Sequence, residues 1–165
     1  MKERRNATMI KLVRIDYRLL HGQVVFAWIN RLGIDRIVII DDEASKDEMK
    51  KTSLKLTKPQ NVKLNIFSVQ DALDRKNKIK ALRENTMIIF SNTRNCYEFL
   101  SNFAGVVKEV NYGGIPNKEG AKQFDKAIFL NEEEIEESKK LRDLGLRLYS
   151  QQTPTTKVVE LNNKL

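Results

Sequence analysis

Three side chains in one short segment are of types that could act together on a phosphoryl group. His21 is the only histidine of the chain, and it follows Asp16 by five residues and Arg18 by three. A neutral imidazole nitrogen can attack phosphorus while an arginine holds the phosphoryl oxygens. A nearby carboxylate can orient the imidazole ring. Nucleophilic attack by His21 on phosphorus fits this pattern best, with Arg18 placed to hold the phosphoryl oxygens.

Other roles for His21 are open on the residues alone. A metal site usually needs three or four ligands, and with no second histidine and one cysteine the remaining ligands would have to be carboxylates. General acid–base catalysis is a second alternative, because imidazole titrates near neutral pH. In the third alternative His21 is half-buried and only hydrogen-bonds the turn.

The elements around this segment predict where the three side chains lie. Residues 10–15 form a compact apolar run that is typical of a strand buried on both faces. A polar turn covers Asp16 to His21, and helical spacing begins after Gly22, with apolar residues at Val25, Trp28, Ile29 and Leu32. In a strand–turn–helix unit, the first N–H groups of the helix point at the crevice beyond the strand. The backbone of Gly22 and Gln23 is therefore expected to hold an anion.

The segment also resembles a known family. It reads V-R-I-D-Y-R-L-L-H-G-Q-V, and the chain continues with N-Y-G-G-I-P at residues 111–116 and Q-Q-T-P at residues 151–154. These motifs resemble the IIB component of the mannose/sorbose family of the phosphoenolpyruvate-dependent sugar phosphotransferase system, over about residues 9–165. Family members often carry aspartate where this chain has Tyr17, and we see no chemistry that this change removes.

The resemblance implies a role for each motif. His21 would be the phosphorylated nucleophile and Arg18 would hold the phosphoryl group, while Asp16 would orient the imidazole or keep the loop closed. The loops after two other strands would add small donors to the phosphate site if those strands are neighbours. The phosphate-binding residues predicted in this way are Gly22, Gln23, Arg14, Ser91, Asn111, Gly113 and Gly114.

The activity implied is that of a protein-N(pi)-phosphohistidine–sugar phosphotransferase. The chain would accept a phosphoryl group from a IIA protein or domain and pass it to a sugar held by the IIC and IID membrane components. No metal or organic cofactor is implied, since positioning and charge stabilisation carry this chemistry. The sugar, the reacting ring nitrogen and the oligomeric state, a homodimer included, are left open by the sequence.

Composition limits the remaining classes. The chain has 165 residues, of which 41% are hydrophobic and 32% are charged, as in globular proteins. Without a signal peptide or an apolar run long enough to span a bilayer, we expect a cytoplasmic protein associated peripherally with its membrane complex. The net charge of +8 comes from dispersed basic residues, so it favours acidic phosphoproteins or an anionic membrane surface over nucleic acid. Cys96 lies within an expected helix and is read as a buried structural thiol.

The alternation of strand and helix patterns predicts the fold. We expect one α/β domain over residues 9–165, with a doubly wound, mostly parallel open sheet and helices on both faces. The family resemblance implies about seven strands and an antiparallel edge strand. Residues 1–8 are expected to be a flexible leader or an extension. Later strands are expected at 36–40, 62–67, 87–90, 109–112, 127–130 and 146–149.

Local signals set the ends of several elements. Ser45 and Glu48 form a predicted capping box at the start of a helix that Pro59 stops. Thr93 is the predicted N-cap of a helix that reaches Phe103. Residues 111–114 are expected to form the loop after a strand, and residues 158–161 are expected to begin a terminal helix.

Two other functions fit the same crevice. A nucleotide-binding enzyme would use it, but neither G-x-G-x-x-G nor G-x-x-x-x-G-K-[ST] occurs in the chain. A non-catalytic ligand-binding or regulatory α/β domain would need no reactive histidine.

Overall fold

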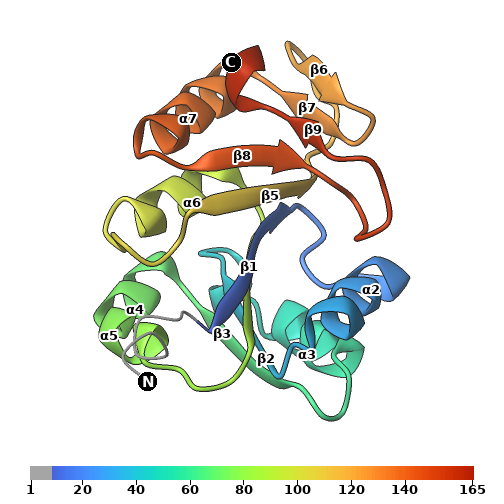
Figure 1. Cartoon of the computed structure of the whole chain (residues 1–165). Coiled ribbons are helices and arrows are strands. Elements are labelled where there is room, and N and C mark those ends of the chain that lie inside the picture. Colours follow the sequence, from blue (N-terminus) through green and yellow to red (C-terminus); the bar gives the residue numbers. More distant parts are fainter. Residues whose placement is uncertain (1–8) are drawn as a thin grey trace.

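A seven-stranded sheet forms the centre of the protein (Figure 1). The computed structural model describes residues 9–165, and the predicted leader lies outside them. The strand order is β3-β2-β4-β1-β5-β8-β9, with every neighbouring pair parallel except β8 and β9, which are antiparallel. The strands are β1 (Ile10–Asp16), β2 (Arg36–Ile40), β3 (Lys63–Phe67), β4 (Thr86–Phe90), β5 (Glu109–Gly114), β8 (Arg147–Ser150) and β9 (Val159–Glu160).

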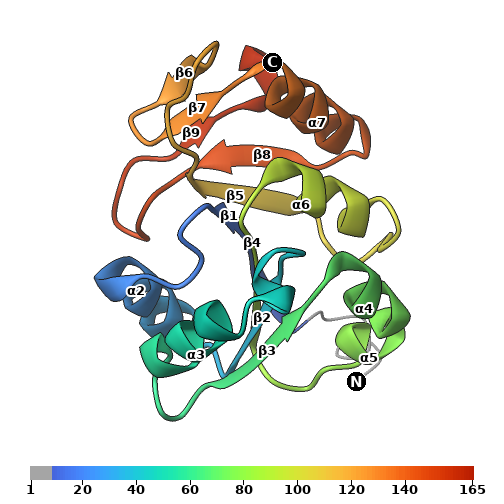
Figure 2. The same cartoon turned by 180° about the vertical axis from the view of Figure 1, so that it is seen from behind.

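Helices cover both faces of this sheet, which confirms the doubly wound class (Figures 1 and 2). One face carries α2 and α3, and the other carries α4, α5, α6 and α7. No helix in residues 9–165 is long and apolar enough to cross a bilayer. The helices are α2 (Gly22–Leu32), α3 (Glu48–Thr57), α4 (Val69–Asp74), α5 (Lys76–Lys80), α6 (Thr93–Leu100) and α7 (Glu132–Asp143).

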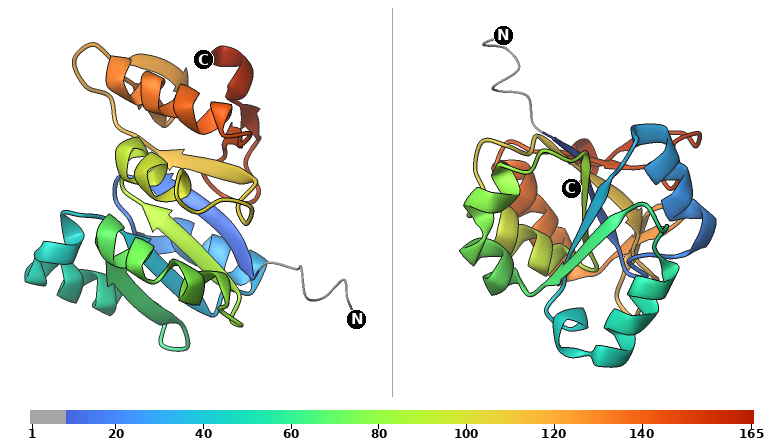
Figure 3. Two further views of the ribbon diagram at one scale, coloured as in Figure 1. Left: turned by 90° about the vertical axis from the view of Figure 1, so that its left-hand side faces the viewer. Right: turned by 90° about the horizontal axis from the view of Figure 1, so that it is seen from below.

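Each face of the sheet has its own hydrophobic core because successive strand residues point to opposite sides. On β2, Ile37 and Ile39 pack with α2 and α3, whereas Val38 and Ile40 pack with the helices of the other face. The central strands are therefore buried on both sides and read as continuous apolar runs. Figure 3 shows the two layers of helices with the sheet between them.

The topology places a crevice beside the end of β1. From the end of β1 the chain enters α2 on one face, whereas from the end of β5 it continues through β6 and β7 to α7 on the other face. Strand β1 lies between β4 and β5, so connections on opposite faces diverge where β1 and β5 end. Doubly wound sheets bind ligands at such switch points.

Several expected element ends were wrong. The predicted Ser45–Glu48 capping box is absent: Asp47 caps α3 by accepting a hydrogen bond from the N–H of Lys50, and Ser45 instead bonds the carbonyl of Asp42. The reason is a short 3-10 turn, η1 (Ala44–Lys46), that delays the helix. Helix α6 is capped by Asn92 and not by Thr93, and it ends at Leu100 and not at Phe103.

The C-terminal third departs from the sequence pattern in three places. Gly113 and Gly114 lie within β5 and not in a loop after it. The strand expected at 127–130 is β7 (Ile128–Leu130), which pairs antiparallel with β6 (Lys122–Asp125) in a separate two-stranded sheet. The expected terminal helix is instead the edge strand β9, followed by η2 (Asn162–Lys164). Strand β9 supplies the antiparallel edge and completes the seven strands.

Candidate active site at the carboxyl end of β1

The loop from Asp16 to His21 is fixed at both ends. At its start, Asp16 accepts hydrogen bonds from two backbone N–H groups: Oδ1 from Arg18 at 3.0 Å, and the main-chain carbonyl from Leu19 at 2.9 Å. Leu19 has a φ of 58°, a strained value for a leucine, and its side chain is fully buried. Leu20 is buried in the same core, so two leucines hold the loop against the protein while Tyr17 and Arg18 are exposed.

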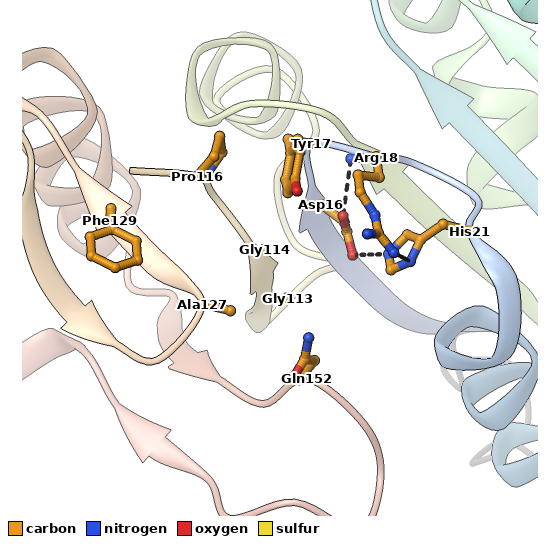
Figure 4. Close-up of a pocket in the computed structure, with 10 residues that line it drawn as sticks. All are labelled: Asp16, Tyr17, Arg18, His21, Gly113, Gly114, Pro116, Ala127, Phe129 and Gln152. Atoms are coloured by element: carbon orange, nitrogen blue, oxygen red, sulfur yellow. Dashed lines mark hydrogen bonds and ion pairs between the residues drawn. The ribbon is translucent and has the colours of Figure 1, made fainter. Parts of the chain in front are cut away.

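His21 contacts both predicted partners through its two ring nitrogens (Figure 4). Nε2 lies 2.7 Å from Asp16 Oδ2, and Nδ1 lies 2.5 Å from a terminal nitrogen of Arg18. Because a guanidinium can only donate, Nδ1 must accept in this contact. The proton of the neutral ring is therefore on Nε2, which donates to Asp16, and the lone pair is on Nδ1.

Arg14 lies beneath Asp16 and contacts the same carboxylate. The side chain of Arg14 is 1% exposed, and one terminal nitrogen lies 3.0 Å from Asp16 Oδ2. Its other terminal nitrogen donates to Asn111 Oδ1 at 2.5 Å and to the carbonyl of Gln151 at 3.1 Å. Burial lowers the pKa of Arg14, and the nearby Asp16 charge opposes that shift.

The two glycines of β5 leave space for these side chains. A Cβ atom at Gly113 would lie 2.0 Å from Cζ of Arg14, so no larger residue fits there without displacing the guanidinium. A Cβ atom at Gly114 would lie 3.3 Å from Asp16 Oδ1. The carbonyl of Gly114 also accepts a hydrogen bond from the N–H of Tyr17 at 3.0 Å, which ties the loop to β5.

An open pocket of about 170 Å³ lies in front of His21 (Figure 4). Asp16 and Arg18 line it on the side of the histidine, and the opposite wall comes from Pro116 and Ala127, which lie between β5 and β7, and from Phe129 of β7. That wall is mostly apolar, whereas the charged side chains gather at the histidine. The lining residues are Asp16, Tyr17, Arg18, His21, Gly113, Gly114, Pro116, Ala127, Phe129 and Gln152.

The predicted phosphate-binding residues fall into different places. Gly113 and Gly114 line the pocket, whereas Arg14 and Asn111 are buried behind it and contact each other. Gly22 and Gln23 form the exposed first turn of α2, and the side chain of His21 does not cap that helix. Ser91 is not among the pocket residues: its hydroxyl donates to Asp41 Oδ1 at the end of β2. The structure thus brings His21, Arg18, Asp16 and the two glycines together and separates Ser91 from them.

Sequence reasoning did not predict the role of the Gln151–Gln152 backbone. The carbonyl of Gln151 accepts hydrogen bonds from Arg14 and Asn111, and the carbonyl of Gln152 accepts one from Trp28 Nε1 at 3.0 Å. Main-chain acceptors carry no residue signature, so only the Q-Q-T-P motif and the lone tryptophan of α2 marked this region. The pocket wall at Pro116, Ala127 and Phe129 was also missed.

Comparison with known proteins identifies the group to which this site belongs. Residues 10–165 match the family described as the PTS system sorbose subfamily IIB component. The chain belongs to this family of IIB components. It is 34% identical over 141 residues to the sorbose-specific EIIB component of Lacticaseibacillus casei, covering 85% of each chain. The fold matches the crystal structure of the IIBSor domain of the Klebsiella pneumoniae sorbose permease with a TM-score of 0.86, at 28% identity and 94% coverage of each chain.

One relative is an EIIAB component, and its name bears on the IIA partner expected for this chain. The chain is 31% identical over 161 residues to the mannose-specific EIIAB component of Escherichia coli K12, covering 95% of this chain but 49% of that protein. This chain thus spans about half the length of that relative. IIB components accept a phosphoryl group from IIA and transfer it to sugar in the phosphotransferase system, so a non-catalytic or nucleotide-binding function is not favoured.

Proposed function

We propose that His21 is the phosphoryl carrier of this IIB component and that Nδ1 is the reacting atom. The observation that carries this proposal is the pair of contacts at the imidazole. Asp16 accepts a hydrogen bond from Nε2–H, and the Nδ1 lone pair lies at the pocket against the guanidinium of Arg18. A nucleophile toward phosphorus needs such a lone pair, and a phosphoryl group arriving there meets the guanidinium of Arg18.

The first half-reaction loads the histidine. Nδ1 of neutral His21 attacks the phosphorus of a phosphohistidine on IIA, forming a new N–P bond. The donor N–P bond breaks, and its electron pair returns to the donor imidazole. Arg18 shifts from Nδ1 to the phosphoryl oxygens, where its charge stabilises the transferring group. The proton stays on Nε2, and the negative charge of Asp16, which accepts its hydrogen bond, compensates the positive charge of the phosphorylated ring.

The second half-reaction transfers the phosphoryl group from His21 to the sugar. A sugar hydroxyl held by IIC and IID attacks the same phosphorus, and the hydroxyl proton leaves to solvent or to a base on those components. The Nδ1–P bond breaks, and its electron pair becomes the Nδ1 lone pair of neutral His21. Because Nε2 is still protonated, the leaving group is a neutral imidazole, which leaves more readily than an anion. We place this reaction at the cytoplasmic face of the membrane complex.

The decisive experiment measures the mass of the intact protein after incubation with phosphoenolpyruvate, Enzyme I, HPr and a cognate IIA. Wild type should gain one phosphoryl group, and the gain should be lost in acid and kept in alkali because N–P bonds are acid-labile. The His21→Ala variant, folded like wild type, should gain none. Since the chain holds one histidine, an acid-labile label on His21→Ala would overturn the proposal.

The position of the phosphoryl group on the ring can be read separately. In the loaded protein, ¹⁵N spectra of the imidazole should place phosphorus on Nδ1 and a proton on Nε2. Phosphorus on Nε2 would require Asp16 to release that nitrogen, and it would contradict the mechanism given above.

A further inference from the structure

The arginine behind Asp16 is more fully buried than a phosphate ligand would be. Its side chain is 1% exposed and is absent from the pocket lining, although the sequence assigned it to the phosphate site. Register explains this placement, because Arg14 on β1 pairs with Asn111 on β5, well inside the sheet. The guanidinium thus reaches the active site only through other side chains.

Three separate segments hold this guanidinium. Asn111 Oδ1 and the Gln151 carbonyl accept from one terminal nitrogen, and Asp16 Oδ2 accepts from the other. Gly113 supplies the space, since a Cβ atom there would lie 2.0 Å from Cζ. Asn111 also donates to the Gln151 carbonyl at 3.0 Å, so the cradle is itself hydrogen-bonded. An arginine held at this many points has one orientation, and it directs one N–H at one carboxylate oxygen.

That oxygen is shared with the histidine. Asp16 Oδ2 accepts from Arg14 at 3.0 Å and from His21 Nε2 at 2.7 Å, and Oδ1 accepts the N–H of Arg18. Burial of a charged pair contributes little net stability on its own because desolvation offsets the attraction. Here the oxygen of Asp16 that Arg14 contacts also accepts the hydrogen bond from the imidazole of His21.

The charges around the pocket also indicate that Arg14 acts through Asp16. The charged side chains that line the pocket are Asp16 and Arg18, with His21 neutral in the attacking state. Arg14 offsets Asp16 from behind, and the uncompensated charge that remains at the mouth is that of Arg18. Without Arg14, the Asp16 carboxylate would cancel Arg18 and repel a phosphoryl group.

We propose that Arg14 is a positioning residue for phosphoryl transfer: it fixes Asp16, and Asp16 fixes the Nε2–H tautomer of His21. The inference rests on the proposed carrier role of His21. Asn111, Gly113 and the Gln151 carbonyl act in the same relay by holding Arg14. The N-Y-G-G and Q-Q-T-P segments therefore contribute to the reaction without touching the phosphoryl group.

The first test replaces Arg14 with lysine. A lysine keeps the charge but cannot donate along the planar fork to Asn111, Gln151 and Asp16 together. We expect kcat for transfer from IIA to fall about 10- to 100-fold, by analogy with the loss of a hydrogen-bond partner that orients a metal-binding histidine. KM for IIA should be unchanged, because the face of the pocket is intact. The matched control is Arg147→Lys, since Arg147 lies at the amino end of β8 and pairs with Glu109 and Glu160.

The second readout is the tautomer of His21, measured by ¹⁵N NMR of the imidazole. Wild type and Arg147→Lys should show protonated Nε2 and unprotonated Nδ1. Arg14→Lys should show a mixture, which a purely structural role for Arg14 would not produce. A wild-type ring with its proton on Nδ1 would overturn the proposal, and so would an Arg14→Lys variant with the wild-type tautomer and rate.

Gly113→Ala gives an independent route if Arg14→Lys does not fold. It keeps every charged group and displaces the guanidinium by steric contact alone, so it should lower kcat and mix the tautomers in the same way. Unchanged kinetics in a folded Gly113→Ala protein would count against the relay. The tautomer is measured without IIA, so it tests the effect of Arg14 on His21 independently of phosphate transfer. Failure of the wild type to take up phosphate would refute the carrier role and would leave that tautomer result standing.

Discussion

Two polar clusters lie at the carboxyl end of the same sheet, and they differ in what their aspartates contact. The Asp16 cluster comprises Asp16, Arg14, Arg18, His21 and Asn111 at the ends of β1 and β5. The Asp41 cluster comprises Asp41, Asp42, Ser91, Asn92 and Asn95 at the ends of β2 and β4. Both contain a buried aspartate and both lie at the carboxyl ends of buried strands.

In the Asp41 cluster, the acceptors are used by neighbouring protein groups. Asp41 accepts from the Ser91 hydroxyl and from the N–H of Ala44 at 2.8 Å. Asp42 accepts from the N–H of Val69 at 2.9 Å and from the Asn95 amide. These contacts join the starts of η1, α4 and α6 to the sheet. The cluster thus fixes loops and helix starts.

In the Asp16 cluster, the aspartate also contacts a side chain at the surface, that of His21. Asp16 is 2% exposed and holds one ring nitrogen of His21, which leaves the other nitrogen at a pocket beside a cation. Polar residues at strand ends are therefore not sufficient to form a site. A histidine ring nitrogen held at an open pocket beside an arginine is the feature that separates the two clusters.

The largest expected effect contrasts an arginine of each region. Arg18→Ala should fold normally and transfer phosphate about 30- to 1,000-fold more slowly, because a single electrostatic stabiliser of a transition state contributes about 2–4 kcal/mol. Lysine at position 18 should rescue only in part. Arg94→Ala is the control, since Arg94 is exposed on α6 and pairs with Glu98 at 3.0 Å. Rapid-quench transfer rates that are equal for the two variants would make Arg18 a structural residue.

The next largest expected effect is on the stability of a Ser91→Ala variant. Ser91→Ala removes a hydrogen bond to the buried Asp41 carboxylate and should lower the free energy of unfolding by about 1–3 kcal/mol, measured in urea. Its rate of transfer should match wild type, because Ser91 is not among the residues that line the pocket. A stable Ser91→Ala variant with slow transfer would instead support the assignment of Ser91 to the phosphate site that the sequence favoured.

This contrast also shows how far the sequence could predict the site. The strand–turn–helix unit, His21 and its two partners follow from residue types and spacing, because all lie within one local segment. The separation of Ser91 from the site depends on strand order: β4 lies between β1 and β2, and the Ser91 hydroxyl reaches toward β2. Local patterns do not encode that order.

Other differences have the same physical origin. Gly113 and Gly114 read as a turn because paired glycines favour turns, yet they are strand residues that make room for Arg14 and Asp16. Residues 158–161 form an apolar pattern too short to separate strand from helix, and the pairing of residues 159–160 with β8 decides for a strand. Tertiary contacts determined both outcomes.

A smaller effect concerns alkaline pH. Burial raises the pKa of Tyr149, which lies close to Arg14, to about 12, and it also raises the pKa of Tyr112. The folded state thus favours the neutral phenols. The Tyr149 contribution to stability is complete below the unfolded pKa near 10 and is lost as pH rises through about 12. Stability in urea should fall above pH 10, and it should fall less steeply in Tyr149→Phe. The Tyr112 contribution remains in that variant, so the slope should not vanish. Equal slopes in both proteins would show that Tyr149 does not take part.

The smallest expected effect is the weak binding of inorganic phosphate to the unphosphorylated protein. Arg18 supplies a cation at the pocket mouth, and the first turn of α2 supplies N–H groups that lack intrahelical acceptors. In a titration followed by NMR, shifts should appear at His21 and Arg18 and at the amides of Gly22 and Gln23. Residues of the Asp41 cluster should not shift, since their acceptors are carboxylates and amides already bonded within the protein. Arg18→Ala should weaken the shifts at His21, whereas Arg94→Ala should leave them unchanged.

Two results would contradict this prediction. Shifts centred on Ser91 and Asn92 would place the anion site at the ends of β2 and β4 instead. No shifts at either cluster would show that the loop holds phosphate only when it is bonded to His21.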